Sequence, residues 1–210
     1  MSYGNTVWAT LEQWSARTFL TAAGLFVLLA VSYGVSAVTG TEIAVSGPDI
    51  IFVFLLVVFV GLLGLYPRLA KRGSTLALGG VGLLAVTAMI ILSTIGLSVL
   101  PIGLTFGKPT IVAIIMSVVG GSTLTLATFG IASLRTRAHP RLVGSFLLVM
   151  AASLLFVFVS MVPFSNPGPA LVSFVTSGLF VISLGAIGYV LRTEDVTANK
   201  AESTGDVTAD

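Results

Sequence analysis

The chain has 210 residues, of which 56% are hydrophobic and only 9% are charged, and its formal net charge is +2. This composition excludes a water-soluble domain, because there are too few polar side chains to cover its surface and lipid must therefore wet most of the outside. The absence of cysteine excludes disulfides, thiol redox chemistry, Fe-S clusters and cysteine-based zinc sites.

The N-terminal segment, residues 1–16, contains Trp8 and Trp14 ahead of the first apolar run. Tryptophan favours the headgroup layer of a bilayer, so this segment is predicted to form a short interfacial helix. The alternative is a mobile tail with incidental aromatic residues. The apolar run that follows, residues 19–38, is long enough to cross a hydrocarbon core of ~30 Å and is predicted to be a retained helix rather than a cleaved signal peptide.

Five further spans are predicted from the remaining apolar runs. Pro67 is expected to end the second span, and a group of prolines between residues 163 and 169 divides the last uncharged stretch into two. The runs are residues 50–66, 76–100, 111–134, and 142–191 before its division. Residues 17–192 are therefore predicted to form an all-α integral membrane domain, a bundle of six transmembrane helices. Residues 193–210 are rich in Thr, Asp and Glu and are predicted to be a disordered acidic tail.

The distribution of positive charge predicts the topology. With six spans, Lys108 alone falls on one side, and the other cations fall on the opposite side: Arg17, Arg68, Lys71, Arg72, Arg135, Arg137, Arg141, Arg192 and Lys200. Positive loops are retained in the cytoplasm, so both termini are expected there in a multi-pass protein of the cell membrane. The excess of arginine over lysine and the acidic tail suggest a prokaryotic origin.

A weak internal repeat has two interpretations. A Gly-Pro signal precedes each even-numbered span, at Pro48, Pro109 and Pro169, and its regular spacing is compatible with three repeated helical hairpins. The simpler explanation is that proline is favoured in the first turn of any helix.

Catalytic, metal and cofactor sites have no support in the sequence. No Asp, Glu, Lys, Arg or His lies inside a predicted span, which disfavours proton-coupled and cation-coupled transport. His139 is the only histidine and, beside Pro140 in a basic turn, is predicted to be a solvated loop residue. Motifs of hydrolases, metalloproteases and nucleotide-binding enzymes are missing, so we expect no enzyme, no cofactor and no nucleic-acid partner.

Small hydroxyl residues and glycines line one face of several spans. Because they recur every three or four positions, they are predicted to allow close helix packing or, alternatively, to line a narrow uncharged path. The candidates are Thr87, Thr94, Ser117, Gly121, Thr125, Thr128 and Ser153.

Two basic turns are expected to face anionic lipid headgroups, which attract each cation by roughly 1 kcal/mol. They consist of Arg68, Lys71 and Arg72, and of Arg135, Arg137 and Arg141. An acidic cytosolic protein is an alternative partner.

Two functional hypotheses follow. The first is a non-catalytic accessory or scaffold subunit, with a protein partner or a second copy of the chain beside it in the bilayer. The second is a permease or exporter of a small neutral or amphiphilic solute, and a membrane-embedded enzyme ranks third. A cavity inside the bundle would favour transport, whereas a tightly packed interior would favour the scaffold.

Overall fold

The computed structural model describes residues 3–40, 48–72, 75–99, 108–160 and 169–205, and the regular elements within these ranges are α-helices. Each helix contains a stretch long and apolar enough to cross a bilayer. The helices are α1 (Tyr3–Thr39), α2 (Pro48–Lys71), α3 (Thr75–Val99), α4 (Lys108–Thr136), α5 (Arg141–Ser160) and α6 (Pro169–Gly205). The predicted six-helix membrane bundle is confirmed.

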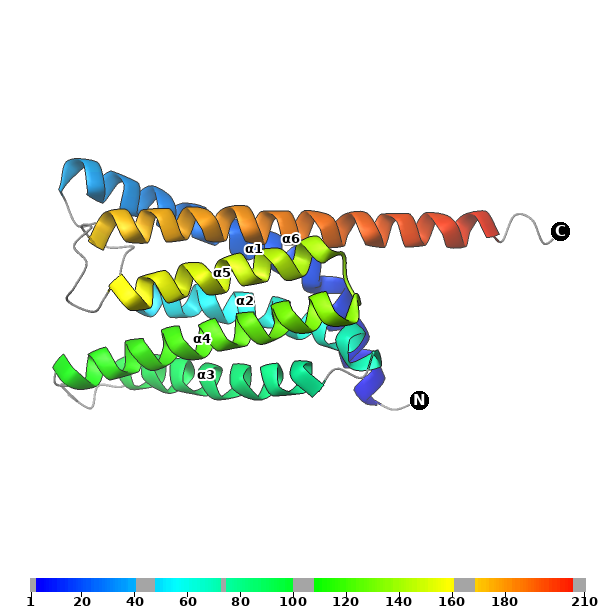
Figure 1. The fold of residues 1–210 in the computed structure, drawn as a ribbon, viewed down its shortest axis with the longest axis horizontal. Helices are drawn as coiled ribbons and strands as arrows, with labels where there is room; N and C mark the ends of the chain where they lie inside the picture. The colour runs from blue at the N-terminus through cyan, green and yellow to red at the C-terminus, as the bar shows by residue number, and fades with distance from the viewer. Residues whose placement is uncertain (1–2, 41–47, 73–74, 100–107, 161–168, 206–210) are drawn as a thin grey trace.

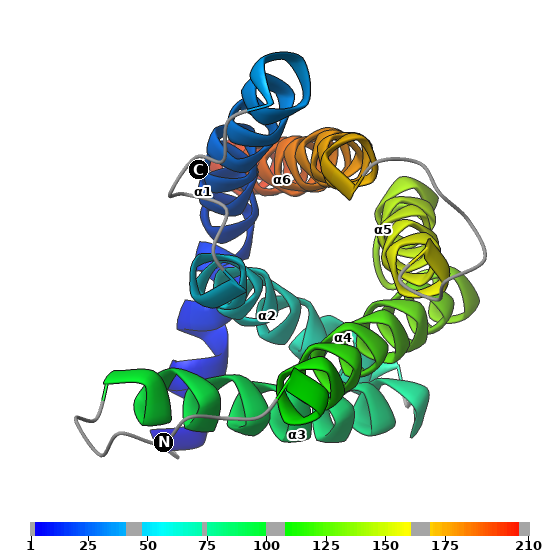
Figure 2. The same ribbon diagram turned by 90° about the vertical axis from the view of Figure 1, so that its left-hand side faces the viewer.

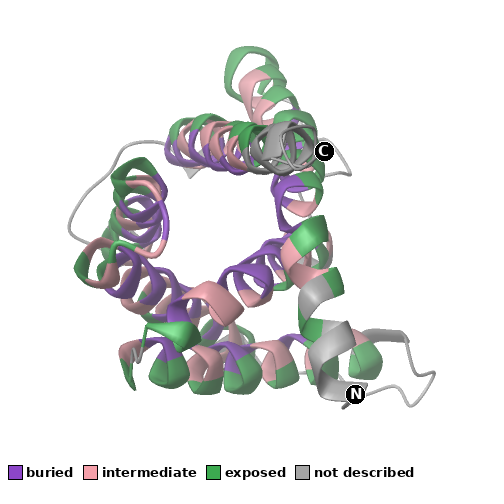
Figure 3. Ribbon diagram, turned by 90° about the vertical axis from the view of Figure 1, so that its right-hand side faces the viewer, coloured by how far each residue is buried: buried purple, intermediate pink, exposed green. Residues whose placement is uncertain are grey.

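Five of the helices are arranged as a ring. Each helix packs against the next one along the chain, α2 also contacts α4 past α3, and α6 packs against α1, which closes the ring of five. Figure 2 shows α1, α2, α4, α5 and α6 around a common axis, with α3 outside them against α2 and α4. Figure 3 shows that buried residues face the inside of this ring and exposed residues face outward.

The outward surface is apolar along the spans. Large hydrophobic side chains are more than half exposed there, among them Leu78, Met89, Leu92, Leu155 and Ile182. A protein whose exterior is as apolar as its core is matched to lipid rather than to water. The chain is therefore a multi-pass membrane protein.

The two ends of the bundle differ in charge. We call the end that carries Arg68, Lys71, Arg72 and the turn 135–141 the basic end, and the opposite end the far end. The start of α1 and the end of α6 also lie at the basic end (Figure 1). The predicted topology places these cations and both termini on one side of the membrane, and the structure groups them at one end of the bundle (Figure 1). That the basic end faces the cytoplasm stays a prediction.

Pro67 does not end α2, contrary to the prediction. The helix continues one turn further, to Lys71, with Pro67 in its interior. A proline inside a helix removes one hydrogen bond, but Leu69 is fully buried and Arg68 pairs with acidic residues of two other helices. These tertiary contacts keep the last turn helical.

The predicted segments at the two termini are continuous with spanning helices. Residues 3–16 belong to α1, without a break at the predicted boundary. The prediction of a disordered tail is wrong for residues 193–205, because α6 continues to Gly205 and extends beyond the other helices (Figure 1). The hydroxyls of Thr193 and Thr197 bond to carbonyls of their own helix, and Glu194 pairs with Arg68. Residues 206–210 lie outside the described ranges.

Prolines occupy the first turn of α2, α4 and α6. Pro48 and Pro169 are the first residues of their helices, and Pro109 is the second residue of α4. The missing N–H of proline costs nothing at such positions. Gly47, Gly107 and Gly168 lie outside the described residues, and the hairpin repeat stays a prediction.

Candidate functional site

The predicted hydroxyl faces of α3 and α4 meet at a close helix contact. A Cβ atom added to Gly121 would clash with the side chain of Thr87, so a larger residue at this position requires Thr87 or its helix to shift. One added to Gly80 would lie 2.9 Å from Oγ1 of Thr128 and from the ring of Phe129. Small residues here let the two backbones approach closely.

Six of the seven candidate residues donate a hydrogen bond to a carbonyl of their own helix, at 2.8 Å in each case. The donors are Thr87, Thr94, Ser117, Thr125, Thr128 and Ser153, while Gly121 carries no side chain. None of the seven lines the cavity described below.

At the basic end, α2 is tied to three other helices by polar contacts. Arg68 donates from Nε to Glu12 on α1 at 2.5 Å and from a terminal nitrogen to Glu194 on α6 at 3.1 Å. Arg72 donates to the carbonyl oxygen of Thr136 at the end of α4, at 2.9 Å. Arg68 and Arg72 therefore join helices as well as carrying charge.

The remaining cations of the two basic turns are exposed. Lys71, Arg135, Arg137 and Arg141 all lie at the surface of the basic end. Aromatic residues accompany them at the same end: Trp8 contacts Tyr66 at a centroid distance of 5.4 Å, and Arg17 lies over the ring of Trp14. Such a mixture of cations and aromatic rings suits the headgroup layer.

His139 is buried, contrary to the prediction of a solvated loop residue. Only 5% of its surface is exposed, and its Nε2 lies 3.4 Å from the carbonyl oxygen of Leu65 on α2. A carbonyl can only accept, so Nε2 is the protonated nitrogen in this contact. The prediction failed because the chain reverses at Arg137, which has a left-handed φ of 50°, and His139 then faces α2.

The surroundings of His139 oppose its protonation. Burial lowers the pKa of His139 from 6.5 to about 4, although the hydrogen bond to Leu65 acts in the opposite direction. The nearby charges of Arg68 and Arg72 lower the pKa further, and Glu12 raises it. His139 thus packs the α4–α5 turn against α2 as an uncharged side chain.

A partly enclosed cavity of about 280 Å³ lies inside the ring, in the half of the bundle toward the far end. Five helices contribute to its wall. The lining residues are Phe26, Leu29 and Tyr33 of α1; Ile51, Phe52 and Leu55 of α2; Ile115, Val118 and Val119 of α4; Leu154 and Val157 of α5; and Ser173, Thr176, Ser177 and Phe180 of α6. Toward the basic end the same helices bury large side chains between them, among them Phe19, Leu62 and Leu147, which are completely buried.

The cavity wall is apolar with a few hydroxyl groups, and none of its lining residues is charged. Phe26 stacks on Phe180 at a centroid distance of 4.8 Å and meets Phe54 edge-on at 6.0 Å. The hydroxyl groups belong to Tyr33 and to Ser173, Thr176 and Ser177 on α6. A largely apolar wall with a few grouped polar atoms is typical of a small-molecule site.

The hydroxyl of Thr176 differs from the packing hydroxyls of α3 and α4. Thr176 is 9% exposed, and its Oγ1 has no hydrogen-bond partner among the described residues. Leaving a buried hydroxyl unsatisfied costs about 1–3 kcal/mol. Ser122 and Ser133 on α4 also bury unpartnered hydroxyls, but neither lines the cavity.

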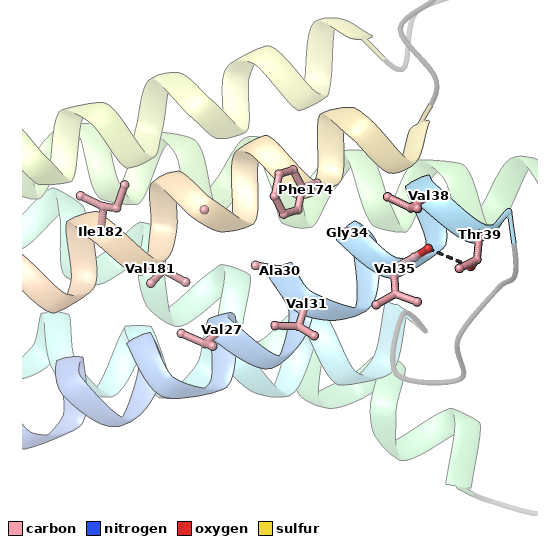
Figure 4. A pocket seen from close by; sticks show the side chains of 11 residues that line it. Val27, Ala30, Val31, Gly34, Val35, Val38, Thr39, Phe174, Val181 and Ile182 are labelled. Carbon is pink, nitrogen blue, oxygen red and sulfur yellow. Dashed lines mark hydrogen bonds between the residues drawn. The ribbon is translucent and has the colours of Figure 1, made fainter.

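A second hollow lies between α1 and α6 near the far end (Figure 4). This groove has a volume of about 680 Å³ and an apolar lining, with small residues on both walls. Val27, Ala30, Val31, Gly34, Val35, Val38 and Thr39 line it from α1, and Phe174, Gly178, Val181 and Ile182 from α6.

Comparison with protein family models, with curated proteins and with solved structures found no match.

The sequence analysis therefore missed both hollows. Their residues are ordinary members of apolar runs, and only the way the helices meet separates a cavity wall from a packed core. One signal was available in the sequence: α6 places Ser173, Thr176 and Ser177 within two turns of Phe180, so hydroxyls and an aromatic ring share one helix face.

Proposed function

We propose that the protein is a carrier, either a permease or an exporter, for a small, uncharged, amphiphilic molecule. The observation that supports this most strongly is the cavity inside the ring, in a position where a packed scaffold would have a solid core. Its volume of about 280 Å³ is close to the lower end of the range for ligand pockets, roughly 300–1,000 Å³, and suits a small ligand.

The lining chemistry supports an uncharged substrate. A charged group in this apolar wall would lose its hydration without gaining a counter-ion, which is strongly unfavourable. The residues that line the cavity include no carboxylate, lysine, arginine or histidine, the usual groups of acid–base catalysis. We therefore propose binding and passage rather than chemical conversion. If the basic end faces the cytoplasm, the cavity lies in the outer half of the bilayer.

Transport can be tested in proteoliposomes loaded with radiolabelled 3-phenoxypropane-1,2-diol, an uncharged probe with a ring and two hydroxyls. The protein should accelerate efflux above the passive rate of protein-free liposomes. Val119→Phe, which fills the cavity, should return efflux to that passive rate. Leu92→Phe, on the lipid-facing surface of α3 where Leu92 is 58% exposed, is the matched control and should leave efflux unchanged. Identical rates with and without the native protein would contradict the proposal.

A second candidate function, a non-catalytic accessory subunit, is favoured by the groove between α1 and α6. Gly178 and Ala30 would let a partner helix approach closely, as small residues do in membranes, whereas Gly34 packs against the ring of Phe174. Because the native chain has no cysteine, a photocrosslinker attached to Val31→Cys reports on the groove alone.

A partner subunit predicts one crosslinked product of fixed mass in native membranes. This product should disappear when Gly178→Leu places a side chain in the groove, where no atom lies within 4 Å of a Cβ at Gly178. Labelling of lipid alone in the Val31→Cys protein would contradict the subunit role.

A further inference from the structure

Thr176 carries a hydrogen-bond donor for which the described part of the chain provides no acceptor. The other buried threonines of the spans, Thr87 and Thr125, donate to the carbonyls of Leu83 and Gly121 in their own helices. Thr176 is also buried, but its Oγ1 atom has no partner among the described residues, and the residue lines the cavity. The unused donor therefore belongs to the one threonine in the cavity wall.

The neighbours of Thr176 restrict what could accept this hydrogen bond. Ser173 and Phe180 lie three positions before and four positions after it, so all three share one face of α6, and all three line the cavity. Phe180 stacks on Phe26 immediately beside this face. The donor thus lies next to a pair of flat aromatic rings, in a wall without charge.

From this juxtaposition we propose that Thr176 is the specificity-determining residue of the cavity, and that the ligand is a ring-containing, uncharged molecule with a carbonyl or ether oxygen. The hydroxyl of Thr176 donates to that oxygen, and the ring packs against Phe26 and Phe180. The inference rests on the proposed binding function of the cavity and adds the chemical class of the substrate.

The experiment compares two unlabelled competitors, one that carries a carbonyl group and one that does not. The full chain in lipid nanodiscs is photolabelled with tritiated benzophenone, a diaryl ketone, and labelled residues are mapped by mass spectrometry. Unlabelled 2-acetylnaphthalene and 2-ethylnaphthalene then compete with the label. Because partitioning into the lipid is the same for every variant, the ratio of the two half-displacing concentrations can be compared between variants without correction.

We expect label on cavity residues of the native chain. The ratio is the half-displacing concentration of 2-ethylnaphthalene divided by that of 2-acetylnaphthalene. We expect this ratio to fall about 5-fold in Thr176→Val, which corresponds to the loss of one neutral hydrogen bond. Thr176→Ser keeps the hydroxyl and should keep the ratio. Thr125→Val is the matched control, since it removes a buried hydroxyl outside the cavity, and it should also keep the ratio.

The outcomes separate the two proposals. If the native cavity takes up label but the ratio is the same in Thr176→Val, the specificity role is overturned while binding stands. If Thr125→Val changes the ratio as much as Thr176→Val, the effect is one of general stability and the role is again overturned. If no label reaches the cavity of the native chain, the proposed function fails together with the inference.

Discussion

The basic end and the far half of the bundle are held together in different ways. At the basic end, α2 is a hub: Arg68 joins it to α1 and α6, Arg72 joins it to α4, and His139 packs the α4–α5 turn against it. The far half contains the cavity and the groove between α1 and α6. Directional polar contacts therefore concentrate in one half of the bundle, and the two hollows lie in the other.

The largest expected effect is an acid sensitivity confined to the basic end. Because the pKa of His139 is lowered in the folded protein, the unfolded chain binds the proton more tightly, and stability is lost as pH falls from 6.5 toward 4. The full difference corresponds to at most about 3 kcal/mol. Unfolding of the detergent-solubilised protein by denaturant, measured by circular dichroism between pH 7 and pH 4, checks this.

The matched variant for this experiment is His139→Asn, which cannot titrate in this range. The difference between native protein and variant isolates the imidazole from every other acid-sensitive group. Equal losses of stability in the two proteins would mean that protonation of His139 does not cause the acid sensitivity.

A second, smaller effect compares glycines in the two regions. A Cβ at Gly64, where α2 crosses α1 near the basic end, would lie 2.5 Å from Cβ of Ser15 and 2.6 Å from the carbonyl oxygen of Leu11. Because backbone cannot yield as a flexible side chain does, Gly64→Ala should lower the free energy of unfolding by about 2 kcal/mol. Gly178→Ala, in the open groove, should instead be neutral or stabilise by up to ~1 kcal/mol. Equal destabilisation by both variants would remove the contrast in packing.

The ion pairs at the hub should have a modest effect. Arg68 and its partners Glu12 and Glu194 keep between 24% and 35% of their side-chain surface exposed, so solvent screens them and Arg68→Gln should cost about 1 kcal/mol. Adding Glu12→Gln to Arg68→Gln should cost less than the sum of the single changes. If the two changes in unfolding free energy are strictly additive, the interaction between Arg68 and Glu12 does not contribute to stability.

The smallest effect is expected at Thr176, and it has the opposite sign. Removing a hydroxyl without a partner relieves an unpaid desolvation cost, so Thr176→Val should leave stability unchanged or raise it by less than ~1 kcal/mol. Thr125→Val removes a satisfied hydrogen bond and should lower stability by about 1 kcal/mol. Thermal unfolding of the two variants in the same detergent distinguishes them, and equal losses would contradict an unsatisfied donor in the cavity.

The fold could be predicted because run length, hydropathy and the positions of cations are local properties of the sequence. The errors at Pro67 and His139 have a different origin. Each depends on contacts with residues distant along the chain: Arg68 with Glu12 and Glu194, and His139 with Leu65. The tail was judged from its polarity alone, although part of it continues a spanning helix that is already formed.

The candidate site could not be predicted for a similar reason. In the sequence Thr176 resembles Thr125, since both are threonines in apolar helices. Their hydrogen bonding differs: Thr125 donates to a carbonyl of its own helix, whereas the buried Oγ1 of Thr176 has no partner among the described residues and its residue lines the cavity. Pattern reasoning selected the regularly spaced hydroxyls, which are the ones that pack helices together.

The unbroken length of α6 has a mechanical consequence. One rod carries Thr176 in the membrane, Glu194 at the level of Arg68, and Gly205 beyond the other helices (Figure 1). At about 1.5 Å per residue, Thr176 lies roughly 27 Å to one side of Glu194, and Gly205 roughly 17 Å to the other. A tilt of α6 about Glu194 would therefore move Thr176 and Gly205 in opposite directions, which couples the cavity wall geometrically to the helix end beyond the basic end.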